Sequence, residues 1–192
     1  MAEISEKVLI EGTANGDESA FKLLVHKYQN MVFNTSLGFL PIKEDAEEIT
    51  QDIFVEVYKS INSFRQDASL KTWVYRITIS KCLEFQRKAK RKKRFAFLVS
   101  IGNTSDTVLE SKIIDHPGVE MEDEERTELL YKQIDQLPDN QKIALVLHNM
   151  DGMSYKEISD TMDVSLSSVE SLIFRAKKNL KKKMLHYYEH NL

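Results

Sequence analysis

The chain has very little cysteine, the residue that cross-links many secreted proteins and holds many zinc ions. Cys82 is the only cysteine among 192 residues, so no disulfide can form within the chain, and no histidine or second cysteine lies at zinc-site spacing. No apolar run approaches the roughly 18 residues that span a bilayer. The N-terminal MAEISEKVLI begins with acidic residues and has no hydrophobic signal-peptide segment. We therefore expect a cytoplasmic protein that binds no metal or other cofactor.

Glycine and proline are also scarce, with six and three residues. No segment alternates polar and apolar residues for long enough to predict a sheet, whereas apolar spacings of three and four recur along most of the chain. The expected fold is all-α, with two small helical domains. In the first domain, helices are expected over residues 18–40, where Asp17 has the position of an N-cap, over 43–60, and from 70 into a basic run.

Charge is unevenly distributed, although the formal net charge is only −3. Residues 1–94 carry 16 Lys and Arg against 13 Asp and Glu, residues 95–136 carry 3 against 10, and residues 137–192 carry 8 against 7. The first basic cluster (residues 87–94) has seven basic side chains in eight positions, and the second (residues 175–183) has six in nine. Two such clusters suggest two modules that bind a polyanion. Solvated helix ends and, for the first cluster, a targeting sequence are the alternatives.

Between the clusters, in residues 95–122, the apolar residues no longer follow the helical spacing of three and four. This stretch contains Gly102, Pro117 and Gly118. We interpret them as an acidic, flexible linker with a short helix near residues 107–114. Helical spacing resumes after the linker, and further helices are expected over residues 124–137 and 140–150.

The end of the chain has the pattern of a helix-turn-helix unit. Ser154 and Glu157 form a capping box at the start of a short helix, 155–162, in which each side chain bonds the backbone N–H of the other. The turn Asp163-Val164-Ser165 follows, and then a longer helix carries the second basic cluster. This order is typical of DNA-binding helix-turn-helix units, although any helical hairpin has a similar pattern.

Two stretches together resemble one protein family. AEEITQDIFVEVYKSINSFRQDASLKTWVYRI (residues 46–77) resembles region two of bacterial RNA polymerase sigma factors, and LPDNQKIALVLHNMDGMSYKEISDTMDVSLSSVESLIFRAKKNL (residues 137–180) resembles their region four. No region one or three is recognisable, so the chain resembles the extracytoplasmic-function (ECF) subgroup of the sigma-70 family. The resemblance extends from about residue 15 to residue 183, and two motifs in the expected order make it specific.

The resemblance implies a dissociable subunit, without catalysis of its own, that binds core RNA polymerase and directs promoter-specific transcription initiation. Residues 1–94 would be region two, 123–192 region four, and 95–122 a linker that enters the polymerase cleft. Expected partners are core polymerase (the clamp coiled coil of its largest subunit and the flap of its second), promoter DNA and an anti-sigma factor, with no small-molecule substrate. The acidic linker would mimic nucleic acid in a basic channel or serve only as a solubilising tether.

The second helix of region two is implied to bind core polymerase. Glu48, Gln51 and Asp52 match the positions that grip the basic clamp coiled coil, and Ile53 and Phe54 would pack beside them. An acidic helix face suits a basic helical partner, because complementary charge steers encounter and fixes register. Without the resemblance, the same residues would predict only an exposed acidic face.

The loop 62–69 and the helix after it resemble the element that melts and captures the minus-ten box. Stacking on aromatic rings contributes about 1–3 kcal/mol per unstacked base, although the aromatic residues here are also ordinary core residues. The first basic cluster would lie along phosphates, adding affinity without sequence information. The full set expected to contact the minus-ten region is Phe64, Arg65, Trp73, Tyr75, Arg76, Ser80, Arg87, Lys88, Lys90 and Arg91.

The last helix is implied to read the minus-thirty-five box. The residues expected to contact it are Ser165, Ser167, Ser168, Glu170, Ser171, Arg175 and Lys178. A carboxylate only accepts hydrogen bonds, so Glu170 should favour cytosine N4 or adenine N6 in the major groove. Arg175 and Lys178 are better placed for phosphates, and Phe174 lies on an outward face.

The chain departs from the usual pattern of the family at several positions. Ser80 and Glu84 replace the usual Asn and Asp near the minus-ten box, and Asp163 replaces the glycine of the helix-turn-helix turn. Asp tolerates the left-handed conformation of such a turn better than most residues. Residues 170–172, Glu-Ser-Leu, stand where Lys-Ser-Arg is common. These departures concern which promoter is read.

Two other functions remain open. A stand-alone helix-turn-helix repressor or activator would use only residues 124–183 and leave the first 94 without a role. A sigma-mimicking adaptor that binds an anti-sigma factor usually carries a receiver domain, which is not recognisable here. An enzyme is not expected, because the sequence has no glycine-rich phosphate loop, paired catalytic carboxylates or nucleophile motif.

Overall fold

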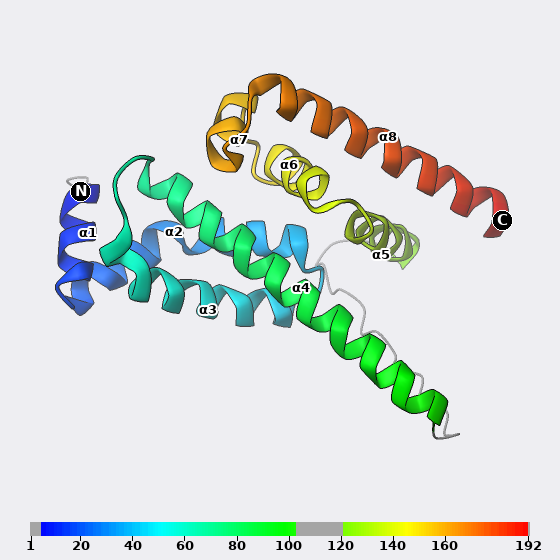
Figure 1. The fold of residues 1–192 in the computed structure, drawn as a ribbon, viewed down its shortest axis with the longest axis horizontal. Coiled ribbons are helices and arrows are strands. Elements are labelled where there is room, and N and C mark those ends of the chain that lie inside the picture. Colours follow the sequence, from blue (N-terminus) through cyan, green and yellow to red (C-terminus); the bar gives the residue numbers. More distant parts are fainter. Residues whose placement is uncertain (1–4, 103–120, 192) are drawn as a thin grey trace.

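The computed structural model describes residues 5–102 and 121–191, and all regular structure in these ranges is helical (Figure 1). The all-α prediction with two helical domains is confirmed. The N-terminal bundle contains α1 (Glu6–Ala14), α2 (Glu18–Phe39), α3 (Lys43–Ser60), a 3-10 turn (Ile61–Ser63) and α4 (Leu70–Gly102). The C-terminal bundle contains α5 (Met121–Asp135), α6 (Asp139–Asn149), α7 (Tyr155–Met162) and α8 (Leu166–Asn191).

Local capping explains where the predicted helices begin. Asp17 caps α2, since its Oδ1 accepts hydrogen bonds from the backbone N–H groups of Ser19 at 2.8 Å and Ala20 at 3.4 Å. Ser69 does the same for α4, accepting from Thr72 N at 3.0 Å. Such bonds satisfy donors that have no partner within the helix.

Helix α1 was not predicted from the sequence. It is only nine residues long, and its contacts with α2 stabilise it: Glu6 Oε1 accepts from Tyr28 Oη at 2.8 Å and from Lys27 Nζ at 3.1 Å. A Cβ at Gly12 would lie 2.5 Å from Ala20 Cβ, so the missing side chain permits this close approach. Helices this short are marginal in isolation, and tertiary contacts therefore decide whether they form.

Helix α4 is longer than expected. It continues to Gly102, whereas the sequence predicted that it would end in the first basic cluster at residue 94. Residues 95–102 (FAFLVSIG) contain no helix breaker before the final glycine, which accounts for the difference. The first basic cluster thus lies inside a helix of 33 residues and not at a frayed helix end. The short helix expected near residues 107–114 lies outside the described residues.

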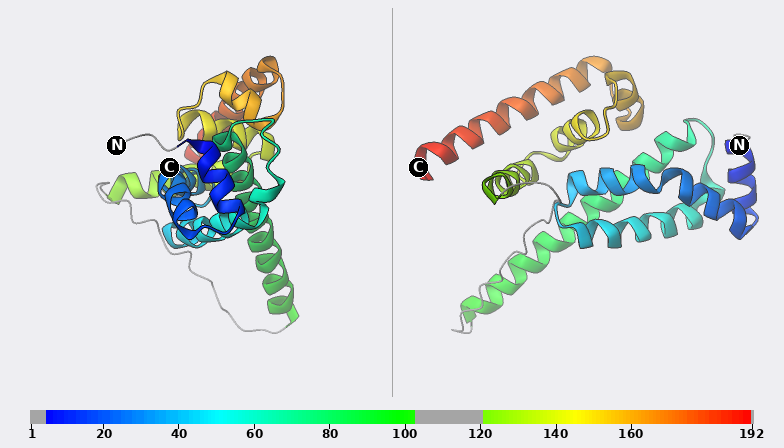
Figure 2. Two further views of the ribbon diagram at one scale, coloured as in Figure 1. Left: turned by 90° about the vertical axis from the view of Figure 1, so that its left-hand side faces the viewer. Right: turned by 180° about the vertical axis from the view of Figure 1, so that it is seen from behind.

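The two bundles pack against each other through α2 and α4 on one side and α6 and α7 on the other. One apolar cluster joins them: it includes Phe39 and Leu83 from the first bundle and Val146 and Ile158 from the second. In Figure 2 the C-terminal bundle lies along one side of the N-terminal bundle, and α3 lies on the opposite side. We call this the closed arrangement.

The described residues contain neither a helix suited to a membrane nor a cluster suited to a metal ion. None of the helices in the described ranges has the length and low charge needed to cross a bilayer. In the same part of the chain, no three His, Cys, Asp or Glu side chains are grouped as a metal ion would require.

Candidate polymerase and DNA interfaces

An acidic face runs along α3, away from the core. Glu48, Gln51 and Asp52 are exposed there, while Ile49 and Val57 on the other side of the helix are buried. Figure 1 shows α3 on the side of the N-terminal bundle away from α6–α8. The three polar residues expected to bind a basic partner are therefore accessible in the closed arrangement.

Ile53 and Phe54 do not belong to this accessible face. Ile53 is fully buried, Phe54 is 7% exposed, and both belong to the main apolar cluster. The structure corrects the expectation that they pack against a partner, because contacts within the bundle already cover them. They position the acidic face by anchoring α3.

The loop before α4 presents a pair of aromatic rings. The centroids of Phe64 and Trp73 lie 5.2 Å apart with the ring planes at 44°, and both side chains are half-buried. Arg65 beside them is exposed, and Gln66 adopts the left-handed region with φ of 59°. The half-buried rings pack on the core and also reach the surface, so the two interpretations made from the sequence are compatible.

Tyr75, in contrast, lies inside the molecule. Its side chain is 3% exposed, and burial, together with the charges of Asp151 and Glu157, raises the pKa of Tyr75 well above its usual value. A base cannot stack on a covered ring. The structure therefore corrects the expectation that Tyr75 contacts the minus-ten box in this conformation.

Arg76 reaches across to the C-terminal bundle. It donates to the backbone carbonyl oxygens of Asp160 at 2.7 Å and Thr161 at 3.1 Å, at the end of α7. Carbonyls at a helix C-terminus lack partners within the helix and attract cations. The exposed Ser80 lines, with Arg76 and Arg87, a groove of about 320 Å³ between α4 and the helices α6 and α7.

Part of the first basic cluster is paired with the C-terminal bundle. Arg87 Nη2 lies 2.7 Å from Asp139 Oδ2, and Lys90 Nζ lies 2.9 Å from Asp135 Oδ2. Both carboxylates belong to the segment where α5 ends and α6 begins. Two of the expected phosphate-binding cations are therefore bound to carboxylates in this conformation.

Other members of the cluster stay on the surface of α4. Lys88 Nζ lies 2.8 Å from Glu84 Oε1, one turn earlier on the same helix, and this bond holds the pKa of Glu84 below its usual value. Arg91 is exposed. Glu84, which departs from the usual family residue, thus binds one cation of the cluster.

A buried lysine lies between the bundles, and the helical spacing alone does not reveal it. Lys142 is 1% exposed and donates to Gln86 Oε1 at 3.0 Å and to Asp135 Oδ1 at 3.0 Å. Gln86 donates in turn to the Phe39 carbonyl at 2.6 Å. Burial lowers the pKa of Lys142. For Asp135, burial acts to raise the pKa, but bonds from Lys90 and Lys142 hold it below its usual value.

A second polar contact between the bundles involves a carboxyl group. Both side-chain oxygens of Asp151 lie 3.0 Å from Thr35 Oγ1, which also lies 2.8 Å from the Met31 carbonyl oxygen. The hydroxyl has one proton, so if it donates to the carbonyl, Asp151 must be protonated to bond it. Burial raises the pKa of Asp151 to about 6, which favours that arrangement.

Helices α7 and α8 form the expected helix-turn-helix unit. Ser154 N donates to Glu157 Oε2 at 2.9 Å, and Glu157 N donates to Ser154 Oγ at 3.3 Å, which completes the capping box. Asp163 adopts the left-handed conformation, with φ of 54° and ψ of 51°, in place of the usual glycine. Ser165 Oγ then accepts from Ser168 N at 3.2 Å at the start of α8.

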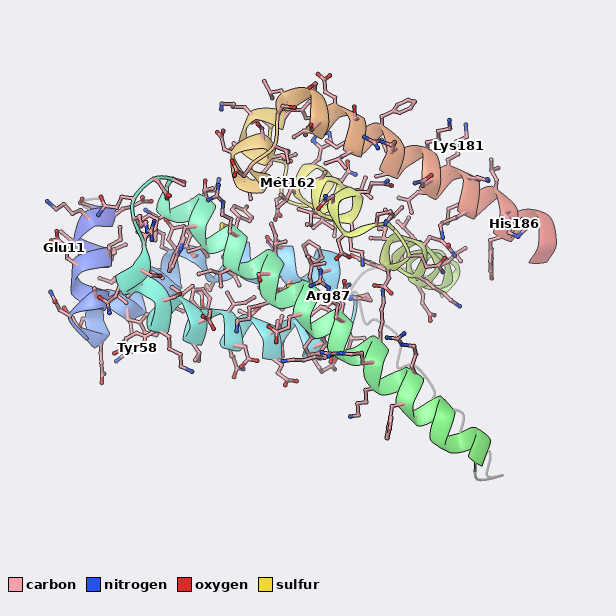
Figure 3. The ribbon with its side chains drawn as sticks, in the orientation of Figure 1. Glu11, Tyr58, Arg87, Met162, Lys181 and His186 are labelled. Carbon is pink, nitrogen blue, oxygen red and sulfur yellow. The ribbon has the colours of Figure 1, made fainter. Side chains whose placement is uncertain are left out.

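The outer side of α8 carries most of the residues expected to contact the minus-thirty-five box. Val169, Ile173 and Ala176 are buried beneath it. Figure 3 shows side chains, Lys181 among them, projecting from this helix, and Phe174 is 67% exposed. The expected contact residues that are exposed are Ser165, Ser167, Glu170, Ser171, Arg175 and Lys178. Ser168 is half-buried, and its hydroxyl lies 2.8 Å from that of Ser165, so it contributes to the start of the helix.

Known proteins resemble this chain in sequence and in fold. Two family models match, Sigma-70 region 2 over residues 24–92 and Sigma-70, region 4 over residues 127–180. The chain is 31% identical over 186 residues to the ECF RNA polymerase sigma-E factor of Haemophilus influenzae, across 96% of this chain and 98% of the relative. The protein of the same name from Escherichia coli K12 is 30% identical over 183 residues, across 95% of each chain.

The chain belongs to the ECF group of the sigma-70 family. A sigma factor is a transcription initiation factor and not an enzyme. Two solved structures share its fold. CnrH in complex with the cytosolic domain of CnrY has a TM-score of 0.61 and 22% identity, and the match covers 92% of this chain and 95% of that one. The sigma factor RpoE in complex with the anti-sigma factor NepR from Bartonella quintana has a TM-score of 0.58 and 18% identity, and the match covers 85% of this chain and 96% of that one. The resemblance seen in the sequence is confirmed.

Proposed function

We propose that this sigma factor docks on core RNA polymerase through the exposed face of α3 and brings two DNA-reading surfaces to a promoter. The observation that carries the proposal is the row Glu48, Gln51 and Asp52, which is exposed above a buried apolar stripe. A helix held rigid from beneath presents its charges without losing conformational freedom on binding. Its acidity fits a basic helical partner such as the clamp coiled coil of the largest polymerase subunit.

The minus-ten surface belongs to the N-terminal bundle. Phe64 and Trp73 offer partly exposed rings to unstacked bases, with Arg65 beside them. Ser80 and the first basic cluster continue this surface along α4 and would follow the phosphates of the upstream duplex. Residues 1–94 would then act as region two of the family.

The minus-thirty-five surface belongs to α8. Ser167, Glu170 and Ser171 lie exposed in its first turns, the part of a recognition helix that reaches base edges. Arg175 and Lys178 follow one and two turns later, where they would contact phosphates. Residues 123–192 would then act as region four, joined to region two through residues 95–122.

An anti-sigma factor and a cytoplasmic location complete the proposal. Both solved relatives are described as complexes, one of them with a named anti-sigma factor, which supports a partner of this kind here. Because the polymerase and the promoter are inside the cell, the chain would act in the cytoplasm.

Charge reversal of the α3 face tests the proposal. Glu48→Lys together with Asp52→Lys should abolish co-purification with core polymerase, because the change replaces attraction by repulsion at the docking face. Exposed substitutions of this kind change stability by less than about 0.5 kcal/mol, so the melting temperature should stay nearly constant. The matched control is Glu11→Lys with Glu18→Lys, two exposed acids away from α3.

Native affinity of the α3 double variant for core polymerase would show that another surface docks. The wild-type protein should also let core polymerase start transcription from promoters selected out of random DNA fragments. A chain that binds such DNA but never supports initiation would instead be a stand-alone regulator.

A further inference from the structure

We propose that the projecting end of α4, from the first basic cluster to Gly102, binds the surface of an anionic lipid membrane. The basic side chains would lie among the lipid phosphates, and the apolar residues that follow them would enter the boundary between headgroups and acyl chains. The inference goes beyond the proposed function and does not depend on it. It concerns binding at a membrane surface and not a helix that spans the bilayer.

The shape of the molecule is the first observation. Figures 1 and 2 show the C-terminal end of α4 projecting past α2 and α3 and away from α8. Arg91, Lys92, Arg94, Phe95 and Ala96 are all exposed on this part of the helix. A surface as wide as a membrane can therefore reach the end of α4 without entering either bundle.

The change of composition along this end is the second observation. Seven of the eight residues at 87–94 are basic, whereas the next seven, FAFLVSI (residues 95–101), contain no charge and only one polar residue. Phe95, the first of them, is 70% exposed, the largest fraction among the large apolar residues that the structure describes. Exposed apolar surface beside concentrated charge is typical of a site that a partner covers.

Duplex DNA accounts for the charge of this end but not for its apolar run. Phosphates are bound by cations, backbone N–H groups and hydroxyls, and an apolar side chain adds nothing to such contacts. An anionic membrane complements both parts at once, with lipid phosphates for Lys and Arg and the start of the acyl chains for Phe, Leu and Val. Clusters of about four to eight Lys and Arg on such helices are typical of sites that bind anionic lipids.

The length of the apolar run fits the same partner. Seven helical residues extend about 10 Å, at about 1.5 Å per residue. Helices that bind a membrane surface bury their apolar part about 5–10 Å deep, whereas a span must cross about 30 Å of hydrocarbon. The run is thus long enough for the boundary region and too short to cross the bilayer, and α4 ends directly after it at Gly102.

The cations nearest the apolar run are also the most available. In the first half of the cluster, Arg87 and Lys90 bind carboxylates of the C-terminal bundle. The second half is exposed: Arg91, Lys92 and Arg94. Lipid phosphates and promoter phosphates would therefore be alternative ligands of these three side chains, and a protein on the membrane could not also hold a duplex along this end of α4.

Sedimentation with lipid vesicles tests the proposal. The full chain should bind vesicles of phosphatidylglycerol and phosphatidylcholine in equal parts and should not bind vesicles of phosphatidylcholine alone. Arg91→Gln with Lys92→Gln and Arg94→Gln should weaken binding about 100-fold, because each cation near an anionic surface contributes about fivefold. Absence of wild-type binding to the anionic vesicles, or equal binding to both kinds, would overturn the proposal.

A matched triple variant separates the cluster from net charge. Lys7→Gln, Lys22→Gln and Lys156→Gln also remove three exposed cations, each from a pair within its own helix. This variant should bind the anionic vesicles nearly as well as wild type. If it loses as much binding as the cluster variant, the protein is attracted by its overall charge and the proposed site is wrong.

Phe95 separates a lipid surface from a charged polymer in solution. Phe95→Ser should weaken binding to the anionic vesicles at least about tenfold, because the burial of a phenylalanine side chain is lost. It should leave the affinity for duplex DNA of mixed sequence unchanged. Phe174→Ser is the matched control on α8, where Phe174 is 67% exposed, and it should not alter vesicle binding. Equal vesicle binding by wild type and Phe95→Ser would show that the apolar run takes no part and would overturn the proposal.

A dye beside Phe95 reports whether this end of α4 enters the membrane. Ala96 is exposed, whereas Cys82 is buried, which raises the pKa of its thiol to about 12, so a thiol-reactive dye should label Ala96→Cys selectively. The emission of an environment-sensitive dye there should shift to the blue with anionic vesicles and not with duplex DNA. The same dye on Glu18→Cys, at the exposed start of α2, should not shift. An unshifted emission from the Ala96→Cys protein bound to vesicles would overturn the proposal.

Discussion

The first basic cluster lies along the middle of α4, and its Arg87 and Lys90 are bound to carboxylates of the other bundle. The second lies on α8, where Arg175 donates to the Ser171 carbonyl of its own helix, Lys178 is exposed, and Lys183 donates to the side-chain oxygen of Gln136 in the same bundle. In the sequence both clusters are strongly basic, with seven basic residues in eight positions and six in nine. A count of basic residues therefore measures the attraction to a polyanion but not whether the charges are available to it.

The difference arises from the packing of the bundles and not from the cations themselves. Exposed ion pairs contribute about 0–1 kcal/mol each, so Arg87 and Lys90 are too weakly bound to hold the bundles together. Lys142 is different because it is buried, and a buried charge without its partner is costly. Variants of the two clusters, and of the interface between the bundles, test why only the first cluster is paired with carboxylates of the other bundle.

Removing Lys142 should have the largest effect on stability. Lys142→Ala removes a buried donor from Gln86, whereas Asp135, whose side chain is 38% exposed, keeps its pair with Lys90, so we expect a loss of about 1–3 kcal/mol from the unpaired buried amide. Urea unfolding of the full chain measures the loss. The control is Lys156→Ala, which removes an exposed pair with Asp160 worth about 0.5 kcal/mol or less. Equal effects of the two variants would show that Lys142 is not needed at the interface.

Neutralising two cations in each cluster compares the clusters directly. Arg87→Gln with Lys90→Gln and, separately, Lys178→Gln with Lys181→Gln should weaken holoenzyme binding to all promoters alike. Each lost phosphate contact should lower the log–log salt slope by up to about 0.9. Only the Arg87→Gln, Lys90→Gln variant should also lower the free energy of unfolding, by up to about 1 kcal/mol for each ion pair that it removes. If the Arg87→Gln, Lys90→Gln variant has the same salt slope as wild type, these two residues bind no phosphate and serve only the contact between the bundles.

Changing one residue at the start of α8 should alter sequence preference without a general loss of affinity. Glu170→Ala removes an acceptor of hydrogen bonds from cytosine N4 or adenine N6, and the preference at one position of the minus-thirty-five box should fall by about 1–3 kcal/mol. Selection from a randomised box measures this, with Lys178→Ala as the variant that weakens all sequences equally. Identical sequence profiles for wild type and Glu170→Ala would show that this carboxylate reads no base.

Asp151 should give a smaller, pH-dependent effect. Its pKa is raised to about 6 in the folded protein, from a usual value of 3.8, so folding takes up a proton between these values. The free energy of unfolding contributed by this group therefore falls as the pH rises from about 4 to about 6 and stays low above that range.

Asp151→Asn should remove this dependence, because the amide donates to Thr35 Oγ1 as a protonated carboxyl group would. At pH 7.5 the variant should be more stable than wild type by about 1 kcal/mol, and the advantage should shrink at pH 4.5. Urea unfolding at the two values measures the difference between the proteins, in which the other titrating groups cancel. A constant difference would place Asp151 in its ordinary ionised state.

The sequence by itself determined the helices that have local start signals and the family to which the chain belongs. Asp17, Ser154 and Ser165 cap their helices through atoms at most three residues away, and Asp163 turns the chain by its own backbone conformation. These interactions have the same geometry whatever the rest of the chain does. The acidic face of α3 and the outer face of α8 follow equally from helical spacing.

Only the tertiary structure decided which of the expected site residues are accessible. Ile53 and Tyr75 are covered by the core, and contacts with α2 stabilise the short α1, among them the hydrogen bond from Tyr28 to Glu6. The bond between Lys142 and Gln86 joins residues 56 apart in the sequence, and the bond between Thr35 and Asp151 joins residues 116 apart. Helical spacing is a relation between near neighbours in the chain. Burial and ion pairing instead depend on which surface of the other bundle lies opposite a residue. The packing of the whole molecule decides which surface that is.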